Sequence, residues 1–113
     1  MALPDALAQA FADHLRRDRR RSVHTVRAYQ ATAERLMAFL AVHWGEAVDA
    51  AALARVSTAD LRAFLALRRG EGLTNASAAR ELSAVRGFLK FASEGHVAPT
   101  LKGPRVKKGV PRP

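Results

Sequence analysis

Residues 22–40, which read SVHTVRAYQATAERLMAFL, decide the fold of this chain. Side chains that can be buried recur here at steps of three and four residues, the spacing of one helix face; they are Val26, Tyr29, Ala33, Leu36 and Leu40. Ser22 stands before this stripe and suits a helix N-cap, and Gly45 beyond it suits a left-handed helix end. The stretch therefore predicts an amphipathic helix that packs one face against other helices.

Three further helices are predicted on either side. The first covers residues 4–17, and the next begins at Ser57, with Asp60 at the capping-box position, and is broken around Gly70. The last begins at Thr74 or Asn75 and continues to about Glu94; its expected apolar stripe is Ala78, Leu82, Val85, Leu89 and Ala92, with Phe88 beside it. A short helical turn is expected over residues 50–54. With no strand pattern and no internal repeat, the chain is expected to form a small all-α bundle.

The charge of the chain points to a polyanionic partner. Its 19 Lys and Arg against 10 Asp and Glu give a formal net charge of +9, and arginines crowd residues 16–21. Such a surface attracts nucleic acid, although a basic surface without such a partner is the plain alternative. No apolar run approaches the roughly 20 residues that span a bilayer, and the N-terminus does not resemble a signal peptide. Cysteine is absent, so disulfides and Cys-based zinc sites are excluded. We expect a cytoplasmic protein with no membrane partner.

Signs of catalysis are missing from the sequence. It has no phosphate-binding loop, no dinucleotide-binding glycine motif and no nucleophile elbow, and its 4 histidines lack metal-ligand spacing. Tyr29 lies on the core stripe, where packing is the expected role. We therefore expect no catalytic residue, metal, cofactor or small-molecule substrate.

The polar faces of the helices beginning at Ser22 and near Asn75 share small residues, short polar groups and an arginine. Small residues let a backbone come close to a partner, hydroxyls and helix N-terminal amides suit phosphate, and arginine is the commonest reader of guanine. The outward residues are expected to be Ser22, His24, Arg27, Ala28 and Ala31 on one helix, and Asn75, Ala76, Ser77, Arg80, Ser83, Ala84 and Gly87 on the other. An ordinary solvated helix face explains the same residues, and Glu81 argues slightly against contact with DNA.

The order of these segments resembles that of tyrosine recombinases. Residues 22–29, SVHTVRAY, resemble the S-x-x-T-x-x-x-Y opening of their second helix; residues 57–65, STADLRAFL, and 78–89, AARELSAVRGFL, resemble two later segments. Pro99, residues 104–108 and Val110-Pro111 are similar to the linker into their catalytic domain. The likeness spans about residues 7–113 and is nearest to Xer-type recombinases and phage-like integrases. Ala98 replaces the usual asparagine before proline, and Ala78 and Ala79 replace bulkier residues.

The resemblance implies an orthogonal, SAM-like bundle of four to five helices over residues 1–98, called a core-binding domain, and a basic linker over residues 99–113 towards a catalytic domain that is absent from this chain. In the family, the second and fourth helices face the major groove. Carried over by position, the candidate residues for double-stranded DNA are Ser22, His24, Thr25, Arg27, Ala28, Ser77, Arg80, Ala84, Lys107 and Lys108. Arg80 is the candidate for a base contact, whereas Ser22, Thr25 and Ser77 are phosphate contacts or caps.

The same resemblance places the nucleophilic tyrosine in the absent domain, so this chain is expected to bind DNA without cleaving it. Other recombinase protomers are the expected protein partners. Two alternatives stay open at the level of sequence: a helical protein-interaction module whose basic segments are incidental, and a stand-alone helix-turn-helix DNA-binding protein.

Overall fold

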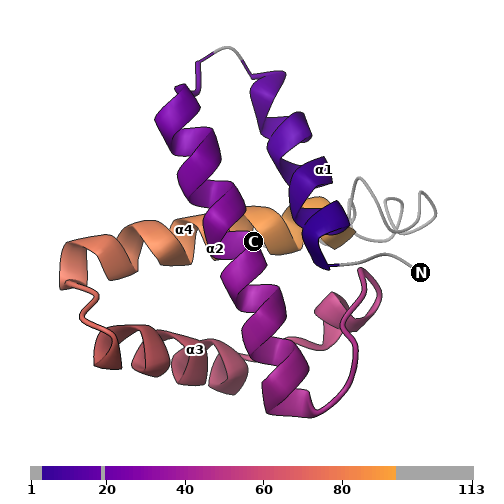
Figure 1. Ribbon diagram of the computed structural model, residues 1–113, viewed down its shortest axis with the longest axis vertical. Helices are drawn as coiled ribbons and strands as arrows, with labels where there is room; N and C mark the ends of the chain where they lie inside the picture. Colours follow the sequence, from indigo (N-terminus) through magenta and orange to yellow (C-terminus); the bar gives the residue numbers. More distant parts are fainter. Residues whose placement is uncertain (1–3, 19, 94–113) are drawn as a thin grey trace, which may run out of the picture.

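The computed structural model describes residues 4–18 and 20–93. They form only helices and connections: α1 (Pro4–Arg16), α2 (Val23–Trp44), the 3-10 turn η1 (Ala52–Arg55), α3 (Thr58–Gly70) and α4 (Asn75–Phe91) (Figure 1). The all-α prediction is confirmed. The predicted end of the last helix at Glu94, the domain boundary at residue 98 and the linker over 99–113 lie outside the described residues. None of the helices in the described part of the chain is long and apolar enough to span a membrane.

The long helix α2 is the centre of the fold. It packs against α1, α4 and α3, and Figure 1 shows α1 lying alongside it while α4 crosses it at a steep angle. The short connection between α1 and α2 turns the chain back so that the two helices run in opposite directions. Because α2 touches every other helix, it fixes where α4 lies and thereby the surface between the two.

Side-chain caps set the helix boundaries where the sequence predicted them. Ser22 Oγ accepts a hydrogen bond of 3.0 Å from the Thr25 backbone N–H at the start of α2. Gly45 ends that helix with φ of 71°, a left-handed conformation that glycine adopts without strain. Thr74 caps α4 by accepting from the Ser77 N–H at 3.2 Å. These contacts fix which residues of α2 and α4 lie in the first turn.

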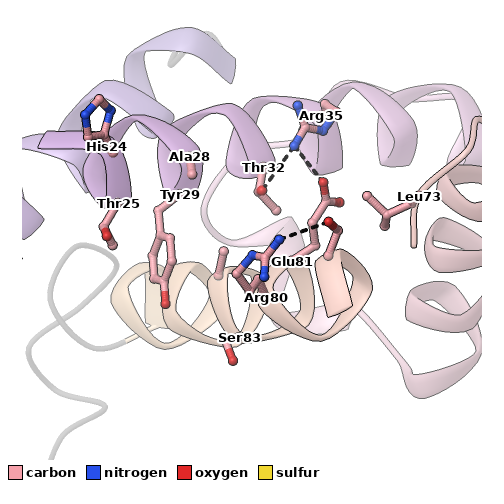
Figure 2. Close-up of a pocket in the computed structure, with 12 residues that line it drawn as sticks. His24, Thr25, Ala28, Tyr29, Thr32, Arg35, Leu73, Arg80, Glu81 and Ser83 are labelled. Atoms are coloured by element: carbon pink, nitrogen blue, oxygen red, sulfur yellow. Dashed lines mark hydrogen bonds and ion pairs between the residues drawn. The ribbon is translucent and has the colours of Figure 1, made fainter. Parts of the chain in front are cut away.

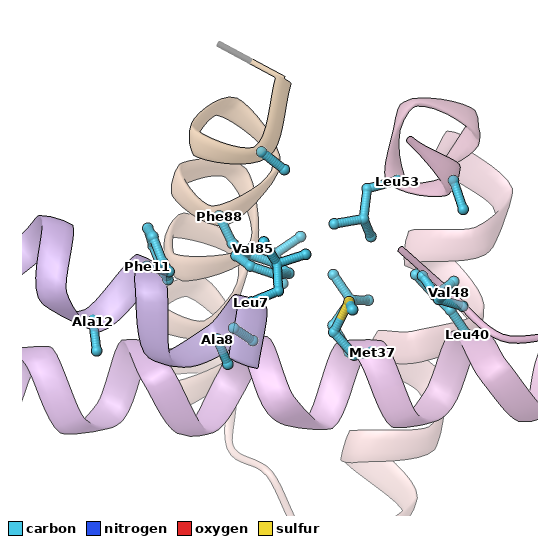
Figure 3. Packing of buried hydrophobic residues seen from close by; sticks show 14 of the residues in the cluster. Leu7, Ala8, Phe11, Ala12, Met37, Leu40, Val48, Leu53, Val85 and Phe88 are labelled. Carbon is cyan, nitrogen blue, oxygen red and sulfur yellow. The ribbon is translucent and has the colours of Figure 1, made fainter. Parts of the chain in front are cut away.

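Aromatic and aliphatic side chains from all four described α-helices, together with apolar residues in the 48–53 stretch, fill the core. Phe11 of α1 packs against Phe88 of α4 with ring centroids 5.2 Å apart, and Leu36 and Leu40 of α2 are fully buried. Figure 3 shows Leu7 and Val85 beside Phe88, with Met37 between this group and Leu40. Each such side chain contributes about 1.5–3 kcal/mol relative to exposure. The core therefore holds α1, α2 and α4 together as one platform.

The buried face of α4 differs from the expected stripe. The side chains of Leu82 and Leu89 are only partly buried. In their place, Glu81 and Ala84 join the buried set, which is Ala78, Glu81, Ala84, Val85 and Phe88. The physical reason is that the small Ala84 lets α4 approach α2 closely, while arginines on α2 and α3 pair with Glu81.

Candidate nucleic-acid interface

A groove of about 470 Å³ lies between α2 and α4 (Figure 2). Leu73, in the connection before α4, closes one end of it. The two helices supply the rest of the lining: His24, Thr25, Ala28, Tyr29, Thr32 and Arg35 from α2, and Ser77, Arg80, Glu81, Ser83 and Ala84 from α4. We call this feature the α2/α4 groove.

The α2/α4 groove brings together most of the candidate residues that lie in the described part of the chain. They are His24, Thr25, Ala28, Ser77, Arg80 and Ala84. The expectation that Ala84 lies on the outward face is wrong, because this residue is only 2% exposed. It lies at the bottom of the groove, where α2 and α4 come close. Ser22 caps α2 and does not line the groove, and Lys107 and Lys108 lie outside the described residues.

Arg27 lies elsewhere. It lines a separate hollow of about 300 Å³ with Arg16, Arg21, Val23 and Val26. A helix advances about 100° per residue, so residues 23, 26 and 27 face α1 while residues 24, 25 and 28 face α4. Arg27 and Ala28 are both exposed, as expected of the outward face, but only Ala28 lines the α2/α4 groove.

The rim of the α2/α4 groove carries exposed positive charge. The Arg80 guanidinium donates to Ser77 Oγ at 3.1 Å, and within residues 4–18 and 20–93 it has no carboxylate partner. The first turns of α2 and α4 contain no acidic residue. The positive dipole end of each helix is therefore not paired with an acidic side chain from its first turn. This favours binding of an anion at either end.

The floor of the groove holds a buried carboxylate. Arg68 of α3 donates to both carboxylate oxygens of Glu81, from Nε to Oε1 at 3.1 Å and from Nη2 to Oε2 at 2.8 Å. Arg35 of α2 reaches Glu81 Oε2 at 2.7 Å. Burial raises the pKa of Glu81, but the hydrogen bonds and charges of Arg68 and Arg35 outweigh it and hold the pKa below its ordinary value. The ionised Glu81 of α4 therefore links α2 and α3, and the arginines of those two helices offset its negative charge within the molecule.

Some groove residues were not anticipated. Thr32 and Arg35 follow Thr25 and Ala28 by seven residues, two helical turns further along α2, so helical spacing could have found them. Tyr29 packs as predicted, its ring stacked on Phe11 at 6.4 Å, and Figure 2 shows it pointing from α2 towards α4 along the groove. The described residues contain no cluster of three or more His, Asp or Glu side chains that could hold a metal ion.

Residues 8–95 match the family described as phage integrase, N-terminal SAM-like domain, and this chain belongs to it.

Among curated proteins, the chain is 34% identical over 105 residues to tyrosine recombinase XerC of Nitrobacter winogradskyi, a match that covers 88% of this chain and 33% of the relative. It is 34% identical over 119 residues to tyrosine recombinase XerC of Mesorhizobium japonicum, covering 99% and 38%. The chain thus spans about a third of the length of these relatives. No solved structure matches the chain significantly.

Proposed function

We propose that this chain is the DNA-gripping domain of a site-specific tyrosine recombinase and that double-stranded DNA lies against the α2/α4 groove. One observation carries the proposal: residues chosen from two separate sequence motifs, at the start of α2 and in α4, line a single groove. Membership of the phage integrase N-terminal family supports it. The formal net charge of +9 supplies the long-range attraction to phosphate.

The chemistry of the groove suits a duplex. Its walls carry alanine and hydroxyl side chains, which allow close approach and hydrogen bonding to phosphate oxygens. Arg80 is exposed at the rim, and within the described residues its guanidinium pairs with no carboxylate. An arginine so placed reads the O6 and N7 acceptors of guanine in the major groove. In this proposal Arg80 reads sequence, while His24, Thr25 and Ser77 position the backbone.

The rest of the reaction is assigned to the remainder of a longer protein. The similar curated proteins are named tyrosine recombinases and are about three times as long as this chain. Strand cleavage and rejoining would therefore be carried out by a catalytic domain outside this chain, with other protomers as partners and in the cytoplasm. Within this proposal residues 99–113 form the basic linker, and Lys107 and Lys108 track phosphates between the two domains.

The proposal is tested by measuring DNA binding of R80A by fluorescence anisotropy. The matched control is R62A, which removes the same charge from an exposed position on α3. R80A is expected to weaken binding to a preferred duplex by about 1–3 kcal/mol and to flatten the preference at one base pair, while R62A changes affinity much less. Equal losses in both variants would reduce the interaction to unspecific charge and favour the helical interaction module.

A further inference from the structure

Two arginines share the Glu81 carboxylate, and they hold it unequally. Arg68 makes two hydrogen bonds to Glu81 and a third to Glu71 Oε1 at 2.8 Å. Its side chain is 18% exposed. The geometry is the two-pronged pairing that makes arginine–carboxylate contacts strong. Arg68 is therefore the fixed partner of Glu81.

Arg35 is the looser partner. Only its Nη2 reaches Glu81, and the same nitrogen makes a long 3.3 Å contact to Thr32 Oγ1. Its Nε–H is buried without a hydrogen-bond partner in the described structure, which is unfavourable for a polar group. Yet the side chain is 39% exposed and lines the α2/α4 groove. Figure 2 shows it above Glu81, on the α2 wall.

Departure of Arg35 from Glu81 would leave no orphaned carboxylate. Arg68 would still neutralise Glu81 with both hydrogen bonds in place, so the usual penalty for an unpaired buried charge does not arise. A phosphodiester offers Arg35 the same single negative charge as the carboxylate and can accept from Nε and Nη together. The exchange would also give the Nε–H the partner that it lacks.

We propose that Arg35 is a latent phosphate ligand: it is held on Glu81 in this structure and turns to a backbone phosphate when a duplex occupies the α2/α4 groove. This inference rests on the proposed function. It gives Glu81 a second role beyond its structural one, because the carboxylate competes with DNA for Arg35. Glu81 thereby lowers the affinity for DNA. Arg35 contributes to DNA binding only after a phosphate has displaced Glu81 as its partner.

The test is a double-mutant cycle on DNA affinity, measured for wild type, R35A, E81Q and R35A/E81Q over a series of salt concentrations. R35A is expected to reduce the slope of log K against log salt by about 0.9, the value for one lost phosphate contact. E81Q is expected to tighten binding, and this gain should disappear in the double variant. An unchanged slope in R35A, or a gain from E81Q that persists without Arg35, overturns the inference.

A direct readout follows the Nε–H resonances of Arg35 and Arg68 by NMR while a short duplex is added. The Arg35 resonance is expected to shift as its Nε–H gains a partner, and that of Arg68 to stay in place. This readout and the R35A slope decide the matter even if E81Q does not fold. A stationary Arg35 resonance beside shifting His24 and Ser77 amides overturns this inference alone, whereas stationary groove amides overturn the proposed function too.

Discussion

The start of α3 and the starts of α2 and α4 look alike in sequence but differ in whether an acidic side chain lies in the first turn. Each begins with a hydroxyl cap. At α3, however, Asp60 closes a capping box with Ser57, accepts a hydrogen bond from Trp44 Nε1 at 3.4 Å and lies 3.3 Å from His43 Nε2. The positive end of that helix is thus satisfied within the molecule.

At α2 and α4 no acidic residue occupies the first turn, and the caps are the hydroxyls of Ser22 and Thr74 alone. Residues from both first turns, Thr25 and Ser77, line the α2/α4 groove. The comparison teaches that a hydroxyl cap by itself says nothing about function. What separates the two kinds of helix start is whether the first turn carries an acidic side chain, as α3 does and α2 and α4 do not; the proposed function assigns the place at α2 and α4 to phosphate.

The largest expected effect comes from placing an acid in the groove. A28E puts a carboxylate between α2 and α4, where it would face phosphate, and like charges held together in an interface cost several kcal/mol. Binding should fall below detection at moderate salt while the thermal melt changes little, since Ala28 is exposed. The control A59E, at an exposed position on α3, should bind as wild type does. Equal DNA binding by A28E and A59E would show that DNA does not contact the α2/α4 groove.

The next effect is on stability and belongs to the start of α3. D60A removes the return bond of the capping box, 2.9 Å from the Ser57 N–H, and the contact to Trp44. The free energy of unfolding should drop by about 0.5–2 kcal/mol, measured by urea denaturation, with DNA affinity of the folded protein unchanged. D13A, which breaks only an exposed pair with Arg16, should cost less. A matching loss of DNA affinity in D60A would place α3 in the interface.

A smaller, paired effect compares A76E with A59E. Each alanine is the second residue of its helix, after Asn75 and Thr58 respectively, and both are exposed. A carboxylate there stabilises either helix by about 0.3–1 kcal/mol through the helix dipole, seen as a raised melting temperature. Only A76E should also weaken DNA binding, because only α4 is proposed to offer its positive end to phosphate. Similar DNA affinities would contradict that difference.

The smallest effect is a pH dependence. The Ser57 backbone N–H, outweighing partial burial, holds the pKa of Asp60 below its ordinary value. A carboxyl whose pKa is lower in the folded state adds stability at pH above its unfolded value, about 3.9, and loses it as the pH falls through the folded value. Wild type should therefore lose more stability than D60N on acidification, measured by denaturant melts at stepped pH. Parallel losses would show that the Asp60 charge adds nothing.

Much of the fold could be predicted because it depends on local signals. Ser22, Ser57 and Gly45 act through their own backbone neighbourhood, and the structure places each where the sequence indicated. The core stripe of α2 follows from spacing alone, since its large apolar side chains leave only one face to bury. Local signals in the sequence thus predict where the helices begin and end and which face of α2 is buried.

The site was only partly predictable, because alanine and arginine fit either face of a helix. Arg27 and Ala28 are adjacent in sequence but belong to different surfaces, and only the packing of α1 decides which. Ala84 was expected to face outward and Glu81 has no place on the apolar stripe, yet both are buried. Glu81 is buried because Arg35 and Arg68 arrive from other helices, a long-range pairing that no local pattern reveals.

The central claim is that DNA occupies the α2/α4 groove and not the start of α3. The most direct measurement is amide chemical-shift mapping by NMR while a short duplex is added at low salt, which tolerates weak binding. The account predicts shifts clustered at residues 22–32 and 75–87, with residues 57–62 unmoved. Shifts confined to the arginines of residues 16–21 and to the C-terminal lysines, with the groove amides unmoved, would contradict it.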